Sequence, residues 1–487
     1  MSSTKQNVEV AETRADALRE RIFSFLEEQS GFFVVSAAPG SGKSVLLLKL
    51  VKQLVTAGKR VVVATQTNSQ ADNLAKDWFG DVINGGSQFT RFSSSKHTRP
   101  ATLAPENWST KFGDIPSGPR VIVANAKKWA YSCATDEVEN LGIHTLFVDE
   151  AYQMTWSTFM QLSPLAPRVV MIGDAGQIPP VVRVESRAWD TSLMPPHWSA
   201  PQTLERLKAN LGKRYQFEEL PTSWRIPEES LKFVQPFYEN VSLDPVAASG
   251  ERGLTWHSSS MPNGEVGEVL LSGAHGHPVL VKVPIGDEGA PQYNDDKVAK
   301  AVANILQALF NFNTETEMVS FSGEKDFRRE VAPLLFKDVM IISTKRSMLA
   351  VLEDAVQPTV HKYRELSESL VYSKGELNGG LLIDTPERTQ GLQRKVVIVV
   401  HPLSGVANPT DFDLDTGRLS VMASRHQVAL FVVSRESVGE VLRENLPSAT
   451  QALGVDDETG NGHRQHSKFW SSFDEGHTID LSVDFVA

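Results

Sequence analysis

The chain has 487 residues, of which 41 % are hydrophobic and 22 % charged, and its formal net charge is −11. This is the composition of a soluble globular protein long enough for several domains. A single cysteine, Cys133, excludes an intramolecular disulfide and a zinc cluster built mainly from thiolates, which is typical of a reducing cytosol. Because neither a signal-peptide core nor an apolar run of roughly 20 residues occurs, we expect a cytoplasmic protein without a membrane partner.

Residues 1–30 form a polar lead-in, after which short apolar runs rich in β-branched residues alternate with helical patterns. Runs that are apolar on both faces are typical of buried parallel strands. A first domain over 31–195 contains five of them: FFVVSA (32–37), RVVVAT (60–65), RVIVAN (120–125), HTLFVDE (144–150) and RVVMIGD (168–174).

A stretch rich in proline and serine, 190–201, indicates a crossing into a second domain over 196–450. This domain repeats the same α/β pattern, and a polar tail over 451–487 follows it. Its predicted strands are PVLVKVP (278–284), DVMIIST (338–344), GGLLIDT (379–385), KVVIVVHP (395–402) and VALFVVSR (428–435).

A glycine-rich turn, SAAPGSGKS, joins the first predicted strand to a helix predicted over 42–57. Glycines let several backbone N–H groups point at one phosphate, and a helix N-terminus adds partial positive charge. Lys43 is placed to reach the β- and γ-phosphate oxygens of ATP, and the Ser44 hydroxyl to ligate Mg²⁺. A turn without a ligand is the alternative, which the strand–turn–helix context disfavours. The predicted ATP contacts come from Ala38, Pro39, Gly40, Ser41, Gly42, Lys43 and Ser44.

The strand over 144–150 ends in the carboxylate pair Asp149 and Glu150. We expect Asp149 to hold Mg²⁺ through water and Glu150 to polarise the attacking water. Read alone, the pair could also be acidic residues at a helix N-terminus, where the helix dipole favours them. The phosphate-binding loop upstream favours the catalytic interpretation.

The strand over 168–174 leads into Gln177, on a turn stiffened by Pro179 and Pro180. A glutamine at this point can hydrogen-bond both the γ-phosphate and the attacking water. We therefore expect Gln177 to report whether ATP is intact.

In their order, these three segments resemble the superfamily 1 helicases. The DEAYQ and GDAGQIPP segments are most similar to superfamily 1B, the branch that contains the nonsense-mediated-decay helicase, and the resemblance covers about residues 31–435. It implies an α/β fold of two tandem RecA-like P-loop domains with parallel sheets and an ATP site in the inter-domain cleft. It also implies Mg²⁺ and ATP as cofactors and single-stranded nucleic acid, DNA or RNA, as the partner.

The resemblance extends to segments that contact the strand in this family. QTNSQADNL is similar to motif Ia, in which the Ser/Thr–Asn pair, here Thr67 and Asn68, touches phosphates. Arg91 in FTRFSSS and Asn125 in VIVANAKKWA stand at the corresponding positions of the next two motifs. In the second half, the resemblance implies strand contacts by Arg346 and Thr385, while Met348 stands where a glutamine is usual.

Two arginines of the second half also match the family. ELPTSWRIPEE and GRLSVMASRHQ resemble motifs whose arginines, here Arg225 and Arg425, reach the γ-phosphate. Gly391 and Gln393 in TQGLQ match nucleotide-contacting positions, with Gln393 replacing an acid that commonly approaches the ribose.

The favoured hypothesis is an ATP-dependent motor, a helicase that moves 5′-to-3′ on single-stranded nucleic acid and couples hydrolysis to strand separation, with DNA favoured over RNA. The alternative is a nucleotide-gated, nucleic-acid-binding ATPase switch within a larger complex, without unwinding of its own. A P-loop kinase for a small metabolite would leave Gln177, Arg225 and Arg425 unexplained.

Four histidines raise the question of a metal site: His275, His277, His463 and His466. They lack cysteine partners, and we expect exposed loop histidines rather than metal ligands.

Overall fold

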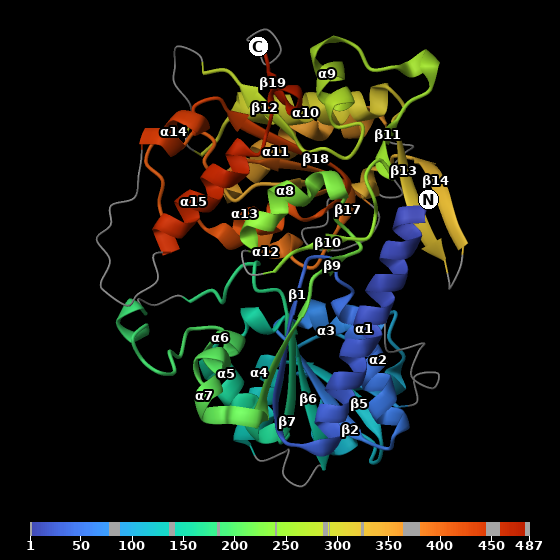
Figure 1. Cartoon of the computed structure of the whole chain (residues 1–487), viewed down its shortest axis with the longest axis vertical. Helices are drawn as coiled ribbons and strands as arrows, with labels where there is room; N and C mark the ends of the chain where they lie inside the picture. Colours follow the sequence, from blue (N-terminus) through green and yellow to red (C-terminus); the bar gives the residue numbers. More distant parts are fainter. Residues whose placement is uncertain are drawn as a thin grey trace. The chain divides into compact units, whose positions relative to one another are not determined.

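The computed structural model describes residues 2–76, 88–135, 142–182, 186–238, 241–285, 291, 293–322, 326–363, 380–444 and 458–482. By their contacts they form two compact units. The N-terminal unit comprises Glu9–Ala175 and Pro179–Thr222, and the C-terminal unit comprises Met1–Val8, Gly176–Ile178 and Ser223–Ala487. Each unit contains a large parallel sheet with helices packed on it (Figure 1).

The sheet of the N-terminal unit has eight strands in the order β4-β3-β5-β2-β6-β7-β1-β8, all paired in parallel. The five strands predicted for the first domain are present, each within a residue of its expected ends. The strands are β1 (Gly31–Ala37), β2 (Arg60–Thr65), β3 (Phe89–Phe92), β4 (Trp108–Ser109), β5 (Arg120–Asn125), β6 (Ile143–Asp149), β7 (Arg168–Gly173) and β8 (Tyr215–Leu220).

Helices cover both faces of this sheet. Phe33 and Val35 of β1 pack with the helices α1 (Ser2–Glu28), α2 (Lys43–Thr56) and α3 (Asn68–Leu74), whereas Val34 belongs to the core on the opposite face. Successive strand residues point to opposite faces, so strands that are apolar at every position are buried on both. The opposite face is covered by α4 (Ala126–Ala134), α5 (Trp156–Leu162) and α6 (Ala200–Arg206), and the short α7 (Lys208–Leu211) follows.

The C-terminal unit contains a second parallel sheet, of six strands in the order β16-β15-β17-β18-β12-β19. It includes all five strands predicted for the second domain. Their observed bounds are β12 (Val279–Val283), β15 (Val339–Ile342), β16 (Leu382–Asp384), β17 (Arg394–Val400) and β18 (His426–Arg435), and β19 (Thr478–Asp480) forms an edge. The prediction of an α/β fold with two parallel sheets is therefore confirmed.

Helices and small sheets complete the C-terminal unit. A large apolar core joins one face of the sheet to α9 (Gly264–Ser272), α10 (Asp296–Asn311) and α11 (Arg346–Lys362). The remaining helices are α8 (Leu231–Val234), α12 (Pro386–Thr389), α13 (Thr416–Ala423), α14 (Val438–Glu444) and α15 (Glu458–Ser471). Antiparallel pairing joins β11 (Arg252–Thr255), β13 (Glu315–Ser322) and β14 (Asp326–Pro333), and a separate pair joins β9 (Thr222–Ser223) to β10 (Asp244–Pro245).

Two segments group differently from the domain boundaries that the sequence suggests. Residues 196–222 group with the N-terminal unit, because β8 pairs with β1. Residues 458–482 of the polar tail contain α15 and β19 and belong to the C-terminal unit. Among the described residues, no helix combines the length and the apolar character needed to cross a membrane.

Candidate functional site

The glycine-rich turn follows β1 and leads directly into α2, as predicted. Gly40 and Gly42 have φ angles of 71° and 86°, in the left-handed region that glycine adopts without a steric penalty. Nothing lies within 4 Å of the position that a Cβ on Gly42 would occupy. The buried Oγ of Ser41 has no hydrogen-bond partner in the described part of the chain. The loop thus offers open space and an unused polar atom, which suit a phosphate ligand.

Lys43 and Glu150 form the charged centre of this site. Lys43 Nζ lies 3.2 Å from each carboxylate oxygen of Glu150, and only 13 % of either side chain is exposed. Glu150 follows β6 with φ 51° and ψ 48°, a left-handed conformation that is uncommon for residues other than glycine. Such backbone conformations cluster at functional sites, where the surrounding structure holds them.

Asp149, the last residue of β6, is buried beside this pair. Burial and the adjacent Glu150 charge together raise its pKa to about 7, while the Lys43 charge acts in the opposite direction. A divalent cation near Asp149 would favour the ionised carboxylate. Oxygen donors such as this carboxylate and the Ser44 hydroxyl are ligands that Mg²⁺ prefers. The residues present therefore fit Mg²⁺.

The strand ends around this centre pack closely. A Cβ on Gly173, the last residue of β7, would lie 2.8 Å from the backbone nitrogen of Ala151. The side chain of the neighbouring Tyr152 is hydrogen-bonded to Ser36 near the end of β1. Burial of Tyr152 raises the pKa of its phenol to about 12. Tyr152 thus ties β1 to the segment that follows β6, a role that no sequence pattern indicated.

A loop after α12, residues 390–393, collects three other predicted site residues in the C-terminal unit. Gln390 Nε2 donates to Gln177 Oε1 at 2.9 Å. Arg225 Nε donates to Gln393 Oε1 at 2.8 Å. Arg425 Nη1 donates to the carbonyl oxygen of Leu392 at 3.4 Å. The structure therefore brings Gln177, both arginines and Gln393 to one short loop.

Gln177 groups with the C-terminal unit because its neighbours on the turn are packed there. A Cβ on Gly417 of α13 would lie 2.7 Å from Cα of Ile178, and one on Gly176 would lie 2.5 Å from the Tyr238 ring. The partner of Gln177, Gln390, was not predicted as a site residue. Its position directly before a glycine in the TQGLQ segment is the signal that could have indicated it.

The two arginines differ in their surroundings. Arg425 is fully buried, and its guanidinium also donates to the Val421 carbonyl oxygen and to Ser424 Oγ, each at 3.1 Å. Arg225 is only partly buried and donates to the Ser424 carbonyl oxygen at 3.1 Å. The γ-phosphate contact of each arginine stays a prediction.

Three predicted strand-contacting residues of the N-terminal unit, Asn68, Arg91 and Asn125, share one hydrogen-bond network, and the fourth, Thr67, lies beside it. Thr67 caps α3 through its side chain, and Asn68 Oδ1 accepts from Arg91 Nη2 at 3.0 Å and from Asn125 Nδ2 at 2.6 Å. Arg91 is fully buried, and its Nε donates to Asp72 Oδ1 at 2.8 Å. In this arrangement Arg91 positions Asn68, and its own contact with a strand stays a prediction.

Asp72 is a member of this network that sequence reasoning missed. It lies four residues after Asn68 on α3, and residues at this spacing share one face of a helix. That spacing, together with the arginine downstream, is the signal that could have revealed it.

The remaining predicted strand contacts lie in the C-terminal unit. Arg346 is exposed at the start of α11. Thr385 is buried between β16 and α12, where its carbonyl oxygen accepts from the backbone nitrogens of Arg388 and Thr389. Met348 is buried in the apolar core. Contact of Arg346 and Thr385 with nucleic acid stays a prediction.

The prediction of exposed loop histidines is wrong for His463 and His466. Both lie in α15 and are buried, with 7 % and 0 % of their surface exposed. His463 Nε2 lies 2.8 Å from the Leu442 carbonyl oxygen, and the His466 ring centre lies 5.4 Å from that of His401. Because the tail is polar in composition, its sequence did not indicate the helix α15, which packs in the C-terminal unit.

Comparison with known families now adds to this geometry. Residues 21–183 match the family described as an AAA domain. The matched stretch contains the glycine-rich turn, Lys43, the Asp149–Glu150 pair and Gln177. The similarity to this family therefore covers the segments for which the sequence predicts nucleotide binding. Comparison with curated proteins gave no match.

Comparison with solved structures gave matches at low identity, of which three are described here. The PRRSV helicase has 15 % identity and a TM-score of 0.38, covering 83 % of this chain and 52 % of its own. The arterivirus nonstructural protein 10 helicase, in complex with DNA, has 13 % identity and a TM-score of 0.39, covering 85 % and 62 %. The ATP-dependent type ISP restriction-modification enzyme LlaBIII, bound to DNA, has 11 % identity and a TM-score of 0.45, covering 96 % and 31 %. The chain thus spans less than two thirds of the length of each.

Proposed function

We propose that this chain is a Mg²⁺- and ATP-dependent motor on single-stranded nucleic acid, a superfamily 1 helicase of the DEAxQ branch. The observation that carries the proposal is the pairing of Lys43 with Glu150 beside the buried Asp149. The contact supports the proposal because this chemistry requires a phosphate-binding lysine near carboxylates that hold a metal ion and activate water.

The proposed cycle begins with Lys43. When ATP occupies the glycine-rich loop, the lysine ammonium exchanges Glu150 for the β- and γ-phosphate oxygens. Glu150 is then released to orient and polarise the attacking water. Ser44 and Asp149 would hold Mg²⁺, which supplies charge neutralisation at the phosphates when bound.

Gln177 is the proposed sensor of the γ-phosphate. Its contact with Gln390 joins it to the loop whose other members hold Arg225 and Arg425. A movement of Gln177 could therefore be transmitted to both arginines through residues 390–393. Arginines that reach a transferring phosphoryl group are typically worth about 10³–10⁵ in rate, so we propose that hydrolysis depends on their approach.

The proposed strand contacts are mostly to phosphates, because a translocating motor gains nothing from strong base preference. Thr67, Asn68 and Asn125 supply hydrogen-bonding groups around one network, and Arg346 supplies an exposed positive charge. DNA as the strand and 5′-to-3′ movement are part of the proposal and rest on family resemblance.

The test is an ATPase titration with poly-dT and, in parallel, poly-U, at several salt concentrations. Turnover should rise with strand concentration, and the apparent affinity should fall as salt increases because phosphate contacts release counterions. A tailed duplex then separates the motor from the alternative switch. Hydrolysis without displacement that a partner protein restores would favour the switch, and no stimulation by either polymer would contradict both.

A further inference from the structure

A basic pocket lies in the N-terminal unit at the amino-terminal ends of the sheet strands, whereas the glycine-rich loop lies at their carboxyl ends. It has a volume of about 460 Å³ and is formed where β2, β5, β6 and β7 begin. The glycine-rich loop follows the carboxyl end of β1, and all strands of this sheet run parallel. The pocket is therefore separate from the site described above.

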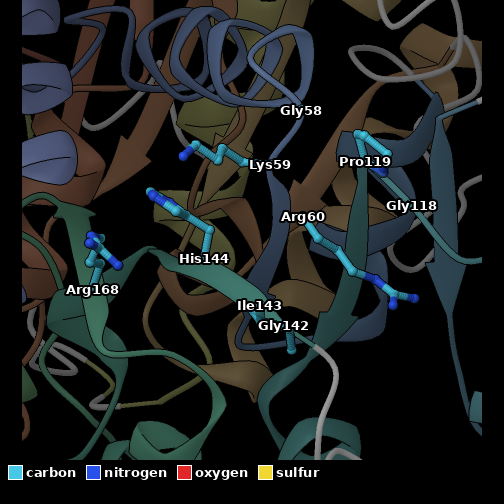
Figure 2. A pocket seen from close by; sticks show the side chains of 9 residues that line it. All are labelled: Gly58, Lys59, Arg60, Gly118, Pro119, Gly142, Ile143, His144 and Arg168. Atoms are coloured by element: carbon cyan, nitrogen blue, oxygen red, sulfur yellow. The ribbon is translucent and has the colours of Figure 1, made fainter.

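Positive side chains dominate the lining of this pocket. Figure 2 shows Lys59, His144 and Arg168 pointing to the same side, while Arg60 points away from them. The ion pair of Lys59 with Glu27 is long, 3.9 Å, and both side chains are about a third or more exposed, which makes it weak.

Within the described residues, the two guanidinium groups that line the pocket have no carboxylate partner. Neither Arg168 nor Arg60 pairs with a carboxylate in the described part of the chain, and the buried Nε of each has no hydrogen-bond partner there. Arg60 instead donates to the Pro116 carbonyl oxygen at 3.3 Å, beside Arg120 on the neighbouring strand. In a chain with a net charge of −11, this is a local excess of positive charge.

The positive charges affect the pKa of His144. Burial lowers the pKa of its imidazole, and the charges of Arg168 and Lys59 lower it further, while Glu27 acts in the opposite direction. An anion bound among these groups would reverse the electrostatic part of the shift.

Three of the lining residues are glycines. Gly58, Gly118 and Gly142 have φ angles of 79°, 95° and 59°, and no atom lies within 4 Å of the Cβ position of any of them. The turns that precede the strands therefore favour glycine, and these three residues add no side chain to the lining. A volume of about 460 Å³ lies in the range of small-molecule sites, about 300–1,000 Å³.

We propose that this pocket is a second anion site, which binds a small phosphate-bearing molecule between Lys59 and Arg168. Arginine presents a fork of N–H donors that matches phosphate oxygens, and lysine adds a mobile point charge. Phosphate groups could come from a free small molecule or from a nucleic-acid backbone. The limited volume favours the free molecule.

The experiment uses the full chain and inorganic pyrophosphate as the probe. The pKa of His144 is followed by NMR, with and without pyrophosphate, in a Lys43→Ala background that removes phosphate binding at the glycine-rich loop. We expect pyrophosphate to raise the pKa of His144 saturably. Replacing Arg168 by Gln or Lys59 by Gln should weaken pyrophosphate binding at least tenfold, whereas Lys52→Gln, an equal loss of charge at an exposed position on α2, should leave it unchanged.

Thermal unfolding of each variant shows whether it is folded. If one of the two pocket variants does not fold, the other still tests the proposal. An unchanged His144 pKa in the presence of pyrophosphate would overturn the proposal, and so would equal affinities in the pocket and control variants. A single-stranded oligonucleotide that raises the His144 pKa when pyrophosphate does not would also overturn it, because the ligand would then be a nucleic-acid backbone.

Discussion

Lys43 Nζ lies 3.2 Å from both carboxylate oxygens of Glu150, a residue 107 positions further along the chain. Each is the counter-ion of the other, so neither charge is left alone in a largely buried site. A ligand that takes Lys43 must bring its own negative charge, and it frees Glu150 at the same moment. In the proposed cycle, this exchange links the binding of a phosphate to the availability of a general base.

Replacing Glu150 by Gln should leave ATP binding intact and abolish hydrolysis. The amide keeps the shape of the side chain but cannot polarise water, and it no longer competes with ATP for Lys43. We expect turnover to fall at least about 10²-fold, the lower end for loss of general base catalysis, with ATP affinity equal or higher. Single-turnover hydrolysis and equilibrium nucleotide binding measure the two effects. Turnover close to that of the wild type would exclude Glu150 as the base.

Asp149 should make the nucleotide-free protein less stable as the pH rises. Its pKa is raised to about 7, so the folded state holds the proton more tightly than the unfolded state does. This stabilisation is complete below about pH 4 and is lost as the pH rises through 7. Asp149→Asn should therefore be more stable than the wild type at pH 8, by up to roughly 4 kcal/mol, and the difference should shrink at pH 5. Urea unfolding at the two pH values measures it. The exposed Asp114→Asn is the control, and an advantage that is independent of pH would contradict the prediction.

Substitution of Arg225 should mainly lower the turnover rate, whereas substitution of Arg425 should also lower the stability of the protein. Arg425→Ala removes a fully buried guanidinium and its hydrogen bonds to Val421, Leu392 and Ser424, which should cost about 2–4 kcal/mol in unfolding free energy. Arg225→Ala should change stability by less than about 1 kcal/mol and lower turnover about 10³-fold or more. Denaturation and ATPase kinetics of both variants test this. Full turnover in Arg225→Ala would argue against a role at the phosphate.

His466 should make the protein sensitive to acid. Both ring nitrogens are buried without a partner in the described part of the chain, and burial lowers the pKa to about 3. A group whose pKa is lowered on folding contributes stability above its unfolded pKa of about 6.5, and this is lost as the pH falls toward 3. His466→Leu should therefore be more resistant to unfolding at pH 5, by about 2 kcal/mol relative to its effect at pH 7.5. His257, whose side chain is 73 % exposed, gives the control His257→Leu. Equal pH profiles for the wild type and His466→Leu would show that the burial has no such effect.

Patterns local in the chain account for most of what the sequence predicted. Ten strands, the glycine-rich turn and the carboxylate pair each depend on a few consecutive residues. β8 was missed because its sequence, YQFEEL, is polar and half-exposed at the sheet edge, where apolar periodicity is weak.

Tertiary contacts account for what the sequence did not reveal. The packing of Gln177 near Gly417, its bond to Gln390, and the burial of Arg91 and Arg425 join residues distant in the chain. No spacing rule contains such contacts. For this reason the resemblance indicated candidate site residues but did not indicate which of them are buried.

The most direct test of the account is the strand-stimulated ATPase turnover of Lys43→Ala, measured beside the wild type and Lys52→Gln with saturating poly-dT or poly-U. The account predicts that turnover rises with at least one polymer in the wild type and the control and is lost in Lys43→Ala. Full stimulated turnover in Lys43→Ala would contradict it, because the phosphate would then be held elsewhere.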